Sequence, residues 1–302
     1  MASVRKPFNW IGGKGRSFAK IKRFLPERCE VYAEPYAGSL ALLFTRQPAL
    51  VEIANDIDPD VVNVYEVFTN DDEFLRLKSF MRTTLHSRAE FARAIEILND
   101  KQLKDKALRA WAFIVCTTQA LSSQITNVKP ENWGRALRYY TWGIGAANVH
   151  LWNAKFDYID RFHERLKNLR VENIDGIDFM LKHDAPNVVY YVDPPYPIET
   201  RSNQKSYRYD VDDEYHHRLV DVLLGLKAAV TLSGYLNSIY TRLEKSGWLR
   251  YDFESVTNSI ARTRDVLRKN KNPLYSHSKI ECVWINQRAQ EMLNAQKGIQ
   301  AF

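Results

Sequence analysis

Short apolar runs bounded by polar or turn-forming residues recur near both ends of the chain. Runs of about four to eight residues are typical of buried strands. We expect strands at residues 31–33, 50–54, 170–174, 188–192, 228–233 and 281–286. An apolar helix start at 40–44 and a helix at 213–226 fall between these runs. Strands that alternate with helices indicate an α/β fold with a doubly wound sheet.

The middle of the chain has a different pattern. Residues 69–169 lack the alternation of strands, and their apolar spacing predicts helices at 72–84, 88–98 and 103–116. A stretch rich in glycine and polar residues follows at 122–148. We therefore expect residues 1–68 and 170–302 to form two halves of one core, with residues 69–169 as a mainly helical insertion between them.

The apolar run at 188–192 ends in Asp193-Pro194-Pro195-Tyr196, which is the most informative segment of the chain. The Asp193 carboxylate and the Pro194 carbonyl can each accept a hydrogen bond, and Pro195 stiffens the segment and removes an N–H. Tyr196 offers a flat face for stacking. Together these groups suit an amino group on a flat ring, such as N6 of adenine or N4 of cytosine.

An amino group of this kind is a poor nucleophile because its lone pair is delocalised into the ring. Two acceptors that bind both amino protons favour a more pyramidal nitrogen, and they act where positive charge develops. The alternative interpretation is structural: the two prolines end a strand, and Tyr196 packs on a neighbouring loop.

Turns in the first 60 residues predict a ligand site. Gly12-Gly13-Lys14 lets a ligand approach the backbone, and the spacing of a P-loop is absent. The segment 34–39 follows a predicted strand, as in the nucleotide-binding opening of a doubly wound sheet. Asp56 ends the next strand, about 20 residues on, where an acidic residue normally holds a ribose. Alternatively, Asp56 is a helix N-cap before Pro59.

These segments together resemble the Dam-type family of DNA amino-methyltransferases, which transfer a methyl group from S-adenosylmethionine to N6 of adenine. The resemblance covers residues 8–63 and the chain from 188 onward, with weaker matches between. It implies a Rossmann-like S-adenosylmethionine-dependent methyltransferase sheet with an inserted target-recognition domain. It implies catalytic roles for Asp193, Pro194, Pro195 and Tyr196. It also implies that the cofactor contacts Trp10, Gly12, Gly13, Lys14, Glu34, Pro35, Tyr36, Ala37, Gly38, Ser39, Asp56, Ile57, Asp178, Phe179 and Asp193.

Two features depart from the family pattern. The cofactor turn of the family usually reads Phe-x-Gly-x-Gly, whereas this chain has Tyr36-Ala37-Gly38-Ser39-Leu40. Leucine restricts the backbone and adds bulk, so we expect a slightly different turn there. The recognition hairpin of family members that read GATC has no clear match, so GATC specificity is not implied.

The distribution of charge predicts duplex DNA as the partner. The net charge is +7, and residues 69–170 hold 17 Lys and Arg against 11 Asp and Glu. Basic groups neutralise phosphates, and interleaved aromatic rings can wedge a duplex or stack on bases. The candidate DNA contacts are Ser122, Ser123, Trp133, Arg135, Arg138, Arg201, Lys205, Arg208, Asn258 and Arg262. The alternatives are core packing for the tryptophan, an inert linker at 197–209 and a solvated loop at 258–279.

Other site classes find no support in the sequence. Cys29, Cys116 and Cys282 are far apart and lack metal-site spacing, so we expect reduced structural cysteines and no metal. No run approaches the roughly 18 apolar residues of a membrane span, and no signal peptide precedes Phe8. We expect a cytoplasmic protein of a prokaryotic or phage-infected cell, with a partner restriction endonuclease left open.

The predicted function is therefore site-specific methylation of adenine N6 in duplex DNA, on a target base flipped out of the stack. Methylation of cytosine N4 is chemically close, although the leading Asp193 favours adenine. RNA or protein-glutamine methyltransferases usually have Asn at that position. A catalytically silent DNA-binding module with the same fold is the alternative from a different class.

Overall fold

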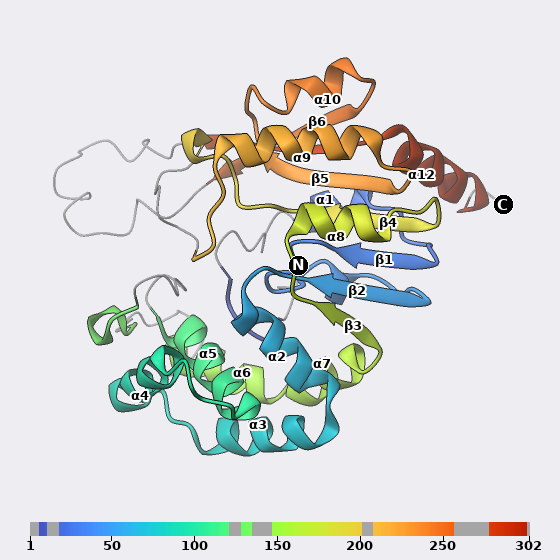
Figure 1. The fold of residues 1–302 in the computed structure, drawn as a ribbon. Helices are drawn as coiled ribbons and strands as arrows, with labels where there is room; N and C mark the ends of the chain where they lie inside the picture. Colours follow the sequence, from blue (N-terminus) through green and yellow to red (C-terminus); the bar gives the residue numbers. More distant parts are fainter. Residues whose placement is uncertain are drawn as a thin grey trace.

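A computed structural model describes residues 6–10, 18–120, 128–134, 147–200, 208–256 and 278–300. Its strands form one seven-stranded sheet in the order β3-β2-β1-β4-β5-β7-β6 (Figure 1). The strands are β1 (Val31–Glu34), β2 (Val51–Asn55), β3 (Leu169–Glu172), β4 (Val188–Val192), β5 (Ala229–Tyr235), β6 (Leu249–Val256) and β7 (Ser278–Ile285). β7 runs antiparallel to both β5 and β6, and the other neighbouring pairs are parallel.

The central strand β4 is buried on both faces because its side chains alternate between two hydrophobic clusters. Val189 and Tyr191 belong to one cluster, and Val188, Tyr190 and Val192 belong to the other. The second cluster is covered by α8 (Gly176–His183), α9 (Asp213–Gly225) and α10 (Thr241–Lys245). The first is covered by α1 (Phe18–Ile21), α2 (Pro59–Thr69) and α12 (Gln287–Gln300). Continuous apolar runs are what a strand in this position requires.

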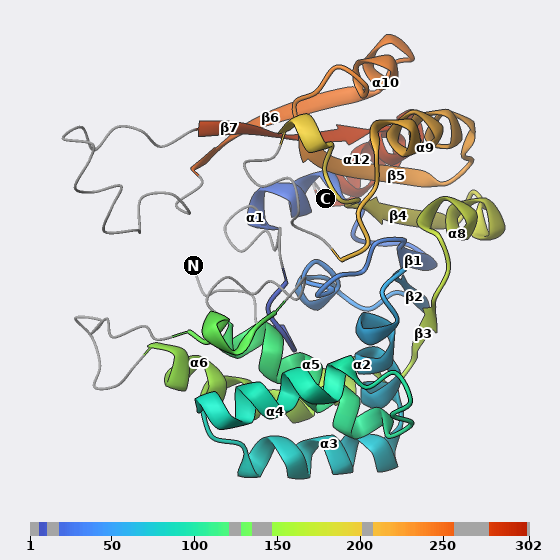
Figure 2. The ribbon, with the colours of Figure 1, turned by 60° about the vertical axis from the view of Figure 1, so that its left-hand side comes forward.

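The middle of the chain is helical, as its pattern predicts. Its helices are α3 (Asp71–Thr83), α4 (Arg88–Asn99), α5 (Lys106–Gln119), α6 (Ala147–Phe156) and α7 (Ile159–Leu166). Helices α3, α4 and α5 gather beyond the β3 edge of the sheet (Figures 1 and 2). Apolar side chains such as Trp111 and Phe113 of α5 join the same cluster as Val189 and Tyr191, so this block packs directly on the core.

The connection from β1 to β2 differs from the expected helix at 40–44. The structure has only a short 3₁₀ helix, η2 (Leu43–Thr45), preceded by two residues with positive φ, Gly38 and Leu40. Thr45 also donates through Oγ1 to the carbonyl of Leu42 at 2.8 Å. Pro48 cannot continue a helix, so the turn passes into β2 without one.

The remaining short elements are the 3₁₀ helices η1 (Lys22–Phe24), η3 (Pro130–Asn132) and η4 (Ile198–Thr200). Within the part of the chain that the structure describes, no helix is both long and apolar enough to cross a bilayer.

Candidate active site

The carboxyl ends of β1, β2 and β3 are tied together by Asn55, which is fully buried at the end of β2. Its Nδ2 donates to the carbonyls of Pro35 at 2.9 Å and Ile174 at 3.0 Å, and its Oδ1 accepts from the Ile174 N–H at 3.1 Å. In open α/β sheets, ligands bind where the strand order reverses. Here that point lies between β1 and β4, which pair in parallel.

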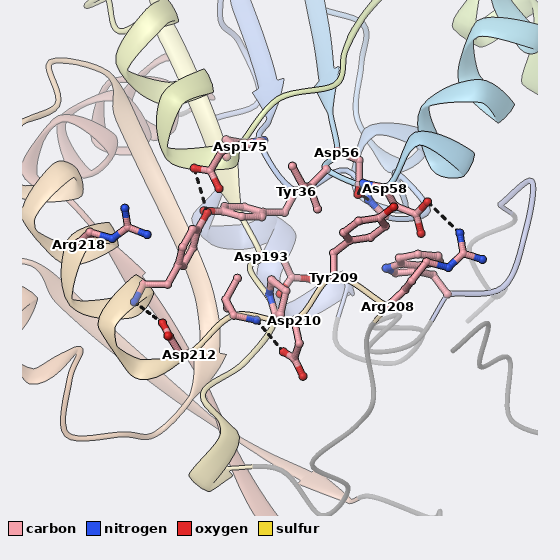
Figure 3. Close-up of a pocket in the computed structure, with 18 residues that line it drawn as sticks. Tyr36, Asp56, Asp58, Asp175, Asp193, Arg208, Tyr209, Asp210, Asp212 and Arg218 are labelled. Atoms are coloured by element: carbon pink, nitrogen blue, oxygen red, sulfur yellow. Dashed lines mark hydrogen bonds and ion pairs between the residues drawn. The ribbon is translucent and has the colours of Figure 1, made fainter. Parts of the chain in front are cut away.

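A pocket of about 370 Å³ lies at these strand ends, a volume within the roughly 300–1,000 Å³ of small-molecule sites. Figure 3 shows its side chains. The strand ends and the N-terminal segment contribute Trp10, Pro35, Tyr36, Gly38, Asp56, Ile57, Asp58, Asp175, Gly176, Asp193 and Pro195. The segment that enters α9 and the helix itself contribute Arg208, Tyr209, Asp210, Val211, Asp212, Tyr215 and Arg218.

The turn after β1 needs a glycine at position 38. Gly38 has φ +47°, and a Cβ there would lie 2.7 Å from Cδ1 of Trp10. A side chain at this position would therefore displace the indole from the pocket wall. The hydroxyl of Tyr65 donates to the carbonyl of Gly38 at 2.5 Å, which fixes the turn from α2.

Asp56 organises the opposite side of the same turn. Its Oδ2 accepts from the Gly38 N–H at 2.9 Å, and its Oδ1 accepts from the Asp58 N–H at 2.9 Å. Burial raises the pKa of Asp56 to about 7, although these backbone donors act in the other direction. The N-cap of α2 is Asp58, whose Oδ1 accepts from the Asp60 N–H at 2.9 Å. The alternative interpretation of Asp56 as an N-cap is therefore wrong.

A pair of tyrosines closes the end of the pocket near β3. The hydroxyls of Tyr36 and Tyr215 lie 2.8 Å apart, and the Tyr215 hydroxyl donates to Oδ1 of Asp175 at 3.4 Å. A Cβ on Gly176 would lie 2.5 Å from Cζ of Tyr36. Gly176 therefore allows the Tyr36 ring to lie against the start of α8 (Figure 3).

The described lining of the pocket is rich in carboxylates. It contains two arginines, Arg208 and Arg218, and six acidic side chains: Asp56, Asp58, Asp175, Asp193, Asp210 and Asp212. Arg208 pairs with Asp58 at 3.3 Å and with Asp60, so its charge is held at the start of α2. The surplus of acceptors and negative charge suits a ligand that carries hydroxyls, amino groups and positive charge.

Of the four residues after β4, 193–196, two line the pocket and two are buried outside it. Asp193 and Pro195 are both half-buried and line the pocket. Pro194 and Tyr196 are buried and are not among the lining residues. The ring of Tyr196 packs edge-on against Tyr235, with 4.7 Å between ring centroids. In this conformation the stacking face expected of Tyr196 is covered by protein.

Several other predicted site residues lie beside the pocket. Glu34, Ala37 and Ser39 are buried next to it without lining it. Asp178 is exposed, and Phe179 is fully buried between His183 and Tyr190. Neither Asp178 nor Phe179 lines the pocket, whereas Asp175 and Gly176, one turn earlier, do.

Trp133 lies in the helical block and is half-buried. Its Nε1 donates to Oε1 of Gln119 at 3.3 Å, and the Arg88 guanidinium lies 5.5 Å from its ring centroid. Outside the described residues lie Gly12, Gly13, Lys14, Ser122, Ser123, Arg135, Arg138, Arg201, Lys205, Asn258 and Arg262. No group of three or more His, Cys, Asp or Glu side chains in the described ranges could hold a metal ion.

The profile of D12 class N6 adenine-specific DNA methyltransferases matches residues 10–246. The chain belongs to this family. The match spans the strand ends that form the pocket and the Asp193 segment. No curated protein matches this chain. Among solved structures, an rRNA methyltransferase, aviRa from Streptomyces viridochromogenes, has a TM-score of 0.37 at 14% identity, over 92% of this chain and 84% of that one.

Sequence patterns missed part of the lining of this pocket. Asp175 comes directly after the predicted strand 170–174, so its place at a strand end was a usable signal. Asp58 follows the predicted ribose ligand by two residues. The wall formed by residues 208–212 has no comparable signal, because it depends on how the loop after Tyr196 returns across the sheet.

Proposed function

We propose that this methyltransferase transfers a methyl group from S-adenosylmethionine to N6 of an adenine flipped out of duplex DNA. The observation that carries the proposal is the position of the Asp193 carboxylate. Asp193 follows β4. It lines the same pocket as Asp56, which follows β2, and Gly38, which lies in the turn after β1. This shared lining supports an amine acceptor beside a cofactor site at the reversal of strand order.

The residues of the pocket fit the cofactor. We propose that Asp56 accepts hydrogen bonds from the ribose hydroxyls and that Asp175, at the Tyr36 end, accepts from the adenine amino group. Ile57, which is 43% exposed, offers an apolar face to the base. Gly38 and Gly176 let the rings of Trp10 and Tyr36 pack against the backbone, where both rings line the pocket. When bound, S-adenosylmethionine supplies an electrophilic methyl group on a positively charged sulfur, which the acidic lining favours.

Asp193 and Pro194 activate the amine. The Asp193 carboxylate accepts one amino proton and the Pro194 carbonyl accepts the other, which shifts the nitrogen lone pair out of conjugation with the ring. Because Pro194 is buried outside the pocket lining, its role requires the segment to turn this carbonyl toward the pocket. The acceptors stabilise the positive charge that develops on nitrogen, and the amine loses its proton after alkylation. Holding the reacting groups in line supplies much of the acceleration. A role for Tyr196 as the stacking partner requires its ring to leave the edge-on contact with Tyr235.

DNA binding is proposed for the basic residues and for Trp133. Lys and Arg groups of the insertion, Arg201 and Lys205 of the segment after Tyr196, and Arg262 would neutralise phosphates of the duplex. The target base must leave the helix because its N6 cannot be reached inside the stack.

The test is to incubate the purified chain with mixed-sequence duplex DNA and S-adenosylmethionine, digest the DNA and identify the nucleosides by mass spectrometry. We expect N6-methyladenine. N4-methylcytosine would overturn the choice of base, and the absence of any methylated base would overturn the proposal. After the site is mapped, 2-aminopurine at the target position should gain fluorescence on binding, because an unstacked base is less quenched.

A further inference from the structure

Ser233 contacts the Asp193 carboxylate from the neighbouring strand. Its Oγ donates to Oδ1 of Asp193 at 2.8 Å. Ser233 lies on β5 and is fully buried. It directly follows Leu232, which pairs with Val192, the last residue of β4, so Ser233 lies on β5 beside Asp193, the first residue after β4.

A second hydroxyl supports this contact from β4. The Tyr191 hydroxyl lies 2.8 Å from Oγ of Ser233, and Tyr191 is only 3% exposed. Burial and the nearby Asp193 charge raise the pKa of Tyr191 well above its usual value, so its hydroxyl keeps its proton.

The direction of the two hydrogen bonds follows from counting protons. A serine hydroxyl has one proton, and an ionised carboxylate can only accept. The Ser233 proton is therefore directed to Asp193, and Tyr191 must be the donor to Ser233. A carboxylate has about four acceptor sites, so this bond does not use up the capacity of Asp193 to accept from an amine.

We propose that Ser233 is a positioning residue for methyl transfer: oriented by Tyr191, it fixes the rotamer of the Asp193 carboxylate that receives the amino group. This inference rests on the proposed function. A free carboxylate rotates about its terminal bond over a broad range, whereas one bond from a buried hydroxyl selects an orientation. A small error in that orientation costs a large part of the rate, and Ser233 itself does not line the pocket.

The decisive variant is Ser233→Ala. We expect kcat to fall about 10- to 100-fold, while the Kd values for S-adenosylhomocysteine and for DNA stay within about twofold. The acid limb of the pH–rate profile should move to higher pH, because a hydrogen bond donated to a carboxylate favours its ionised form.

Thr231→Val is the matched control. Thr231 is another fully buried hydroxyl on β5, but it donates to the carbonyl of Phe24 at 2.8 Å and not to Asp193. We expect this variant to lower the unfolding midpoint and to keep the wild-type kcat. Equal losses of kcat in Ser233→Ala and Thr231→Val would overturn the inference.

The double variant Tyr191→Phe with Ser233→Ala separates stability from positioning. Ser233→Ala alone leaves the buried Tyr191 hydroxyl without its acceptor, which is destabilising. Removing both hydroxyls should raise the unfolding midpoint again but leave kcat low. Recovery of kcat along with stability, or an unchanged kcat in Ser233→Ala, would overturn the inference. Failure of the wild type to methylate DNA would instead overturn the proposed function.

Discussion

The main-chain N–H of Gly38 donates a 2.9 Å hydrogen bond to Oδ2 of Asp56, which joins the turn after β1 to the end of β2. Through this bond one carboxylate both holds the glycine turn and lines the pocket. The shape of the turn and the position of the acceptor are therefore coupled.

Replacing Asp56 with Asn should weaken cofactor binding. Asp56 accepts the two backbone bonds through different oxygens, and an amide replaces one of these oxygens with a donor. The amide also lacks the negative charge that Asp56 carries above its pKa of about 7. A hydrogen bond to a charged group contributes about 1.5–3 kcal/mol, so we expect the Kd for S-adenosylhomocysteine to rise roughly 10- to 100-fold in calorimetry. Asp178→Asn is the control because Asp178 is exposed and outside the pocket. Equal weakening in both variants would contradict the assignment.

Leu40 holds a backbone conformation that favours glycine. Its φ is +50° and its side chain is fully buried. Leu40→Gly and Leu40→Ala should both be destabilised by about 2–5 kcal/mol, because a buried side chain is removed. Glycine should nevertheless be the more stable of the two by about 1 kcal/mol, because a left-handed conformation strains any residue with a Cβ.

Leu42 provides the comparison for Leu40. It is also fully buried, but its φ is −75°. At position 42 the alanine variant should be the more stable, since glycine has the greater backbone entropy to lose. Chemical unfolding of the four variants measures both differences. The same order at both positions would contradict the strained turn.

Two arginines that share Asp60 should have different effects. Arg208 pairs with Asp58 and Asp60 and lines the pocket, whereas Arg109 pairs with Asp60 at 2.5 Å without lining it. Arg208→Ala should raise the Kd for S-adenosylhomocysteine several-fold, because it opens the pocket wall and leaves the Asp58 charge without this partner. Arg109→Ala should lower stability but leave that Kd unchanged.

The salt dependence of DNA binding tests the other role predicted for Arg208. If Arg208 neutralises a phosphate, its removal should reduce the slope of log K against log salt by about one. We expect an unchanged slope, because the guanidinium is already paired with two carboxylates. A reduced slope with normal cofactor binding would show that Arg208 belongs to the DNA interface.

Glu34 should make stability depend on pH. Burial raises the pKa of Glu34 to about 8 from an ordinary value of 4.5. The folded state therefore keeps a proton that the unfolded state loses. Its contribution is fully present below about pH 4.5 and is lost as pH rises through about 8, by at most about 1.4 kcal/mol per pH unit.

Glu34→Gln isolates this effect because the amide does not titrate. The unfolding free energy of the variant relative to wild type should increase between pH 5 and 8. Urea unfolding at several pH values measures the difference. A difference that stays constant over this range would contradict the raised pKa of Glu34.

The sequence was most informative where local pattern and burial agree. The run 188–192 coincides with β4, because a central parallel strand is apolar on both faces. The turn at 34–39 and the acid at 56 also lie around the pocket, since strand ends carry the ligand site in this fold. The turn at 34–39 and Asp56 are about 20 residues apart because each follows one of two neighbouring parallel strands, β1 and β2.

The remaining differences depend on tertiary structure. The positive φ of Leu40 is not helical, and the structure has η2 in place of the helix expected at 40–44. Asp178-Phe179 matched a family pattern, but near the start of α8 the pocket is lined by the N-cap Asp175 and by Gly176, the first residue of the helix. Residues 208–212 line the pocket because the chain returns there after Tyr196. This long-range path cannot be predicted from a local sequence pattern.

The central claim is that the Asp193 carboxylate activates the target amine without holding the cofactor site together. The most direct test is the single-turnover rate of methyl transfer by Asp193→Asn with cofactor and DNA both saturating. We predict a rate at least about 100-fold below wild type, with a Kd for S-adenosylhomocysteine within a few-fold of wild type. A rate near that of the wild type would contradict the claim.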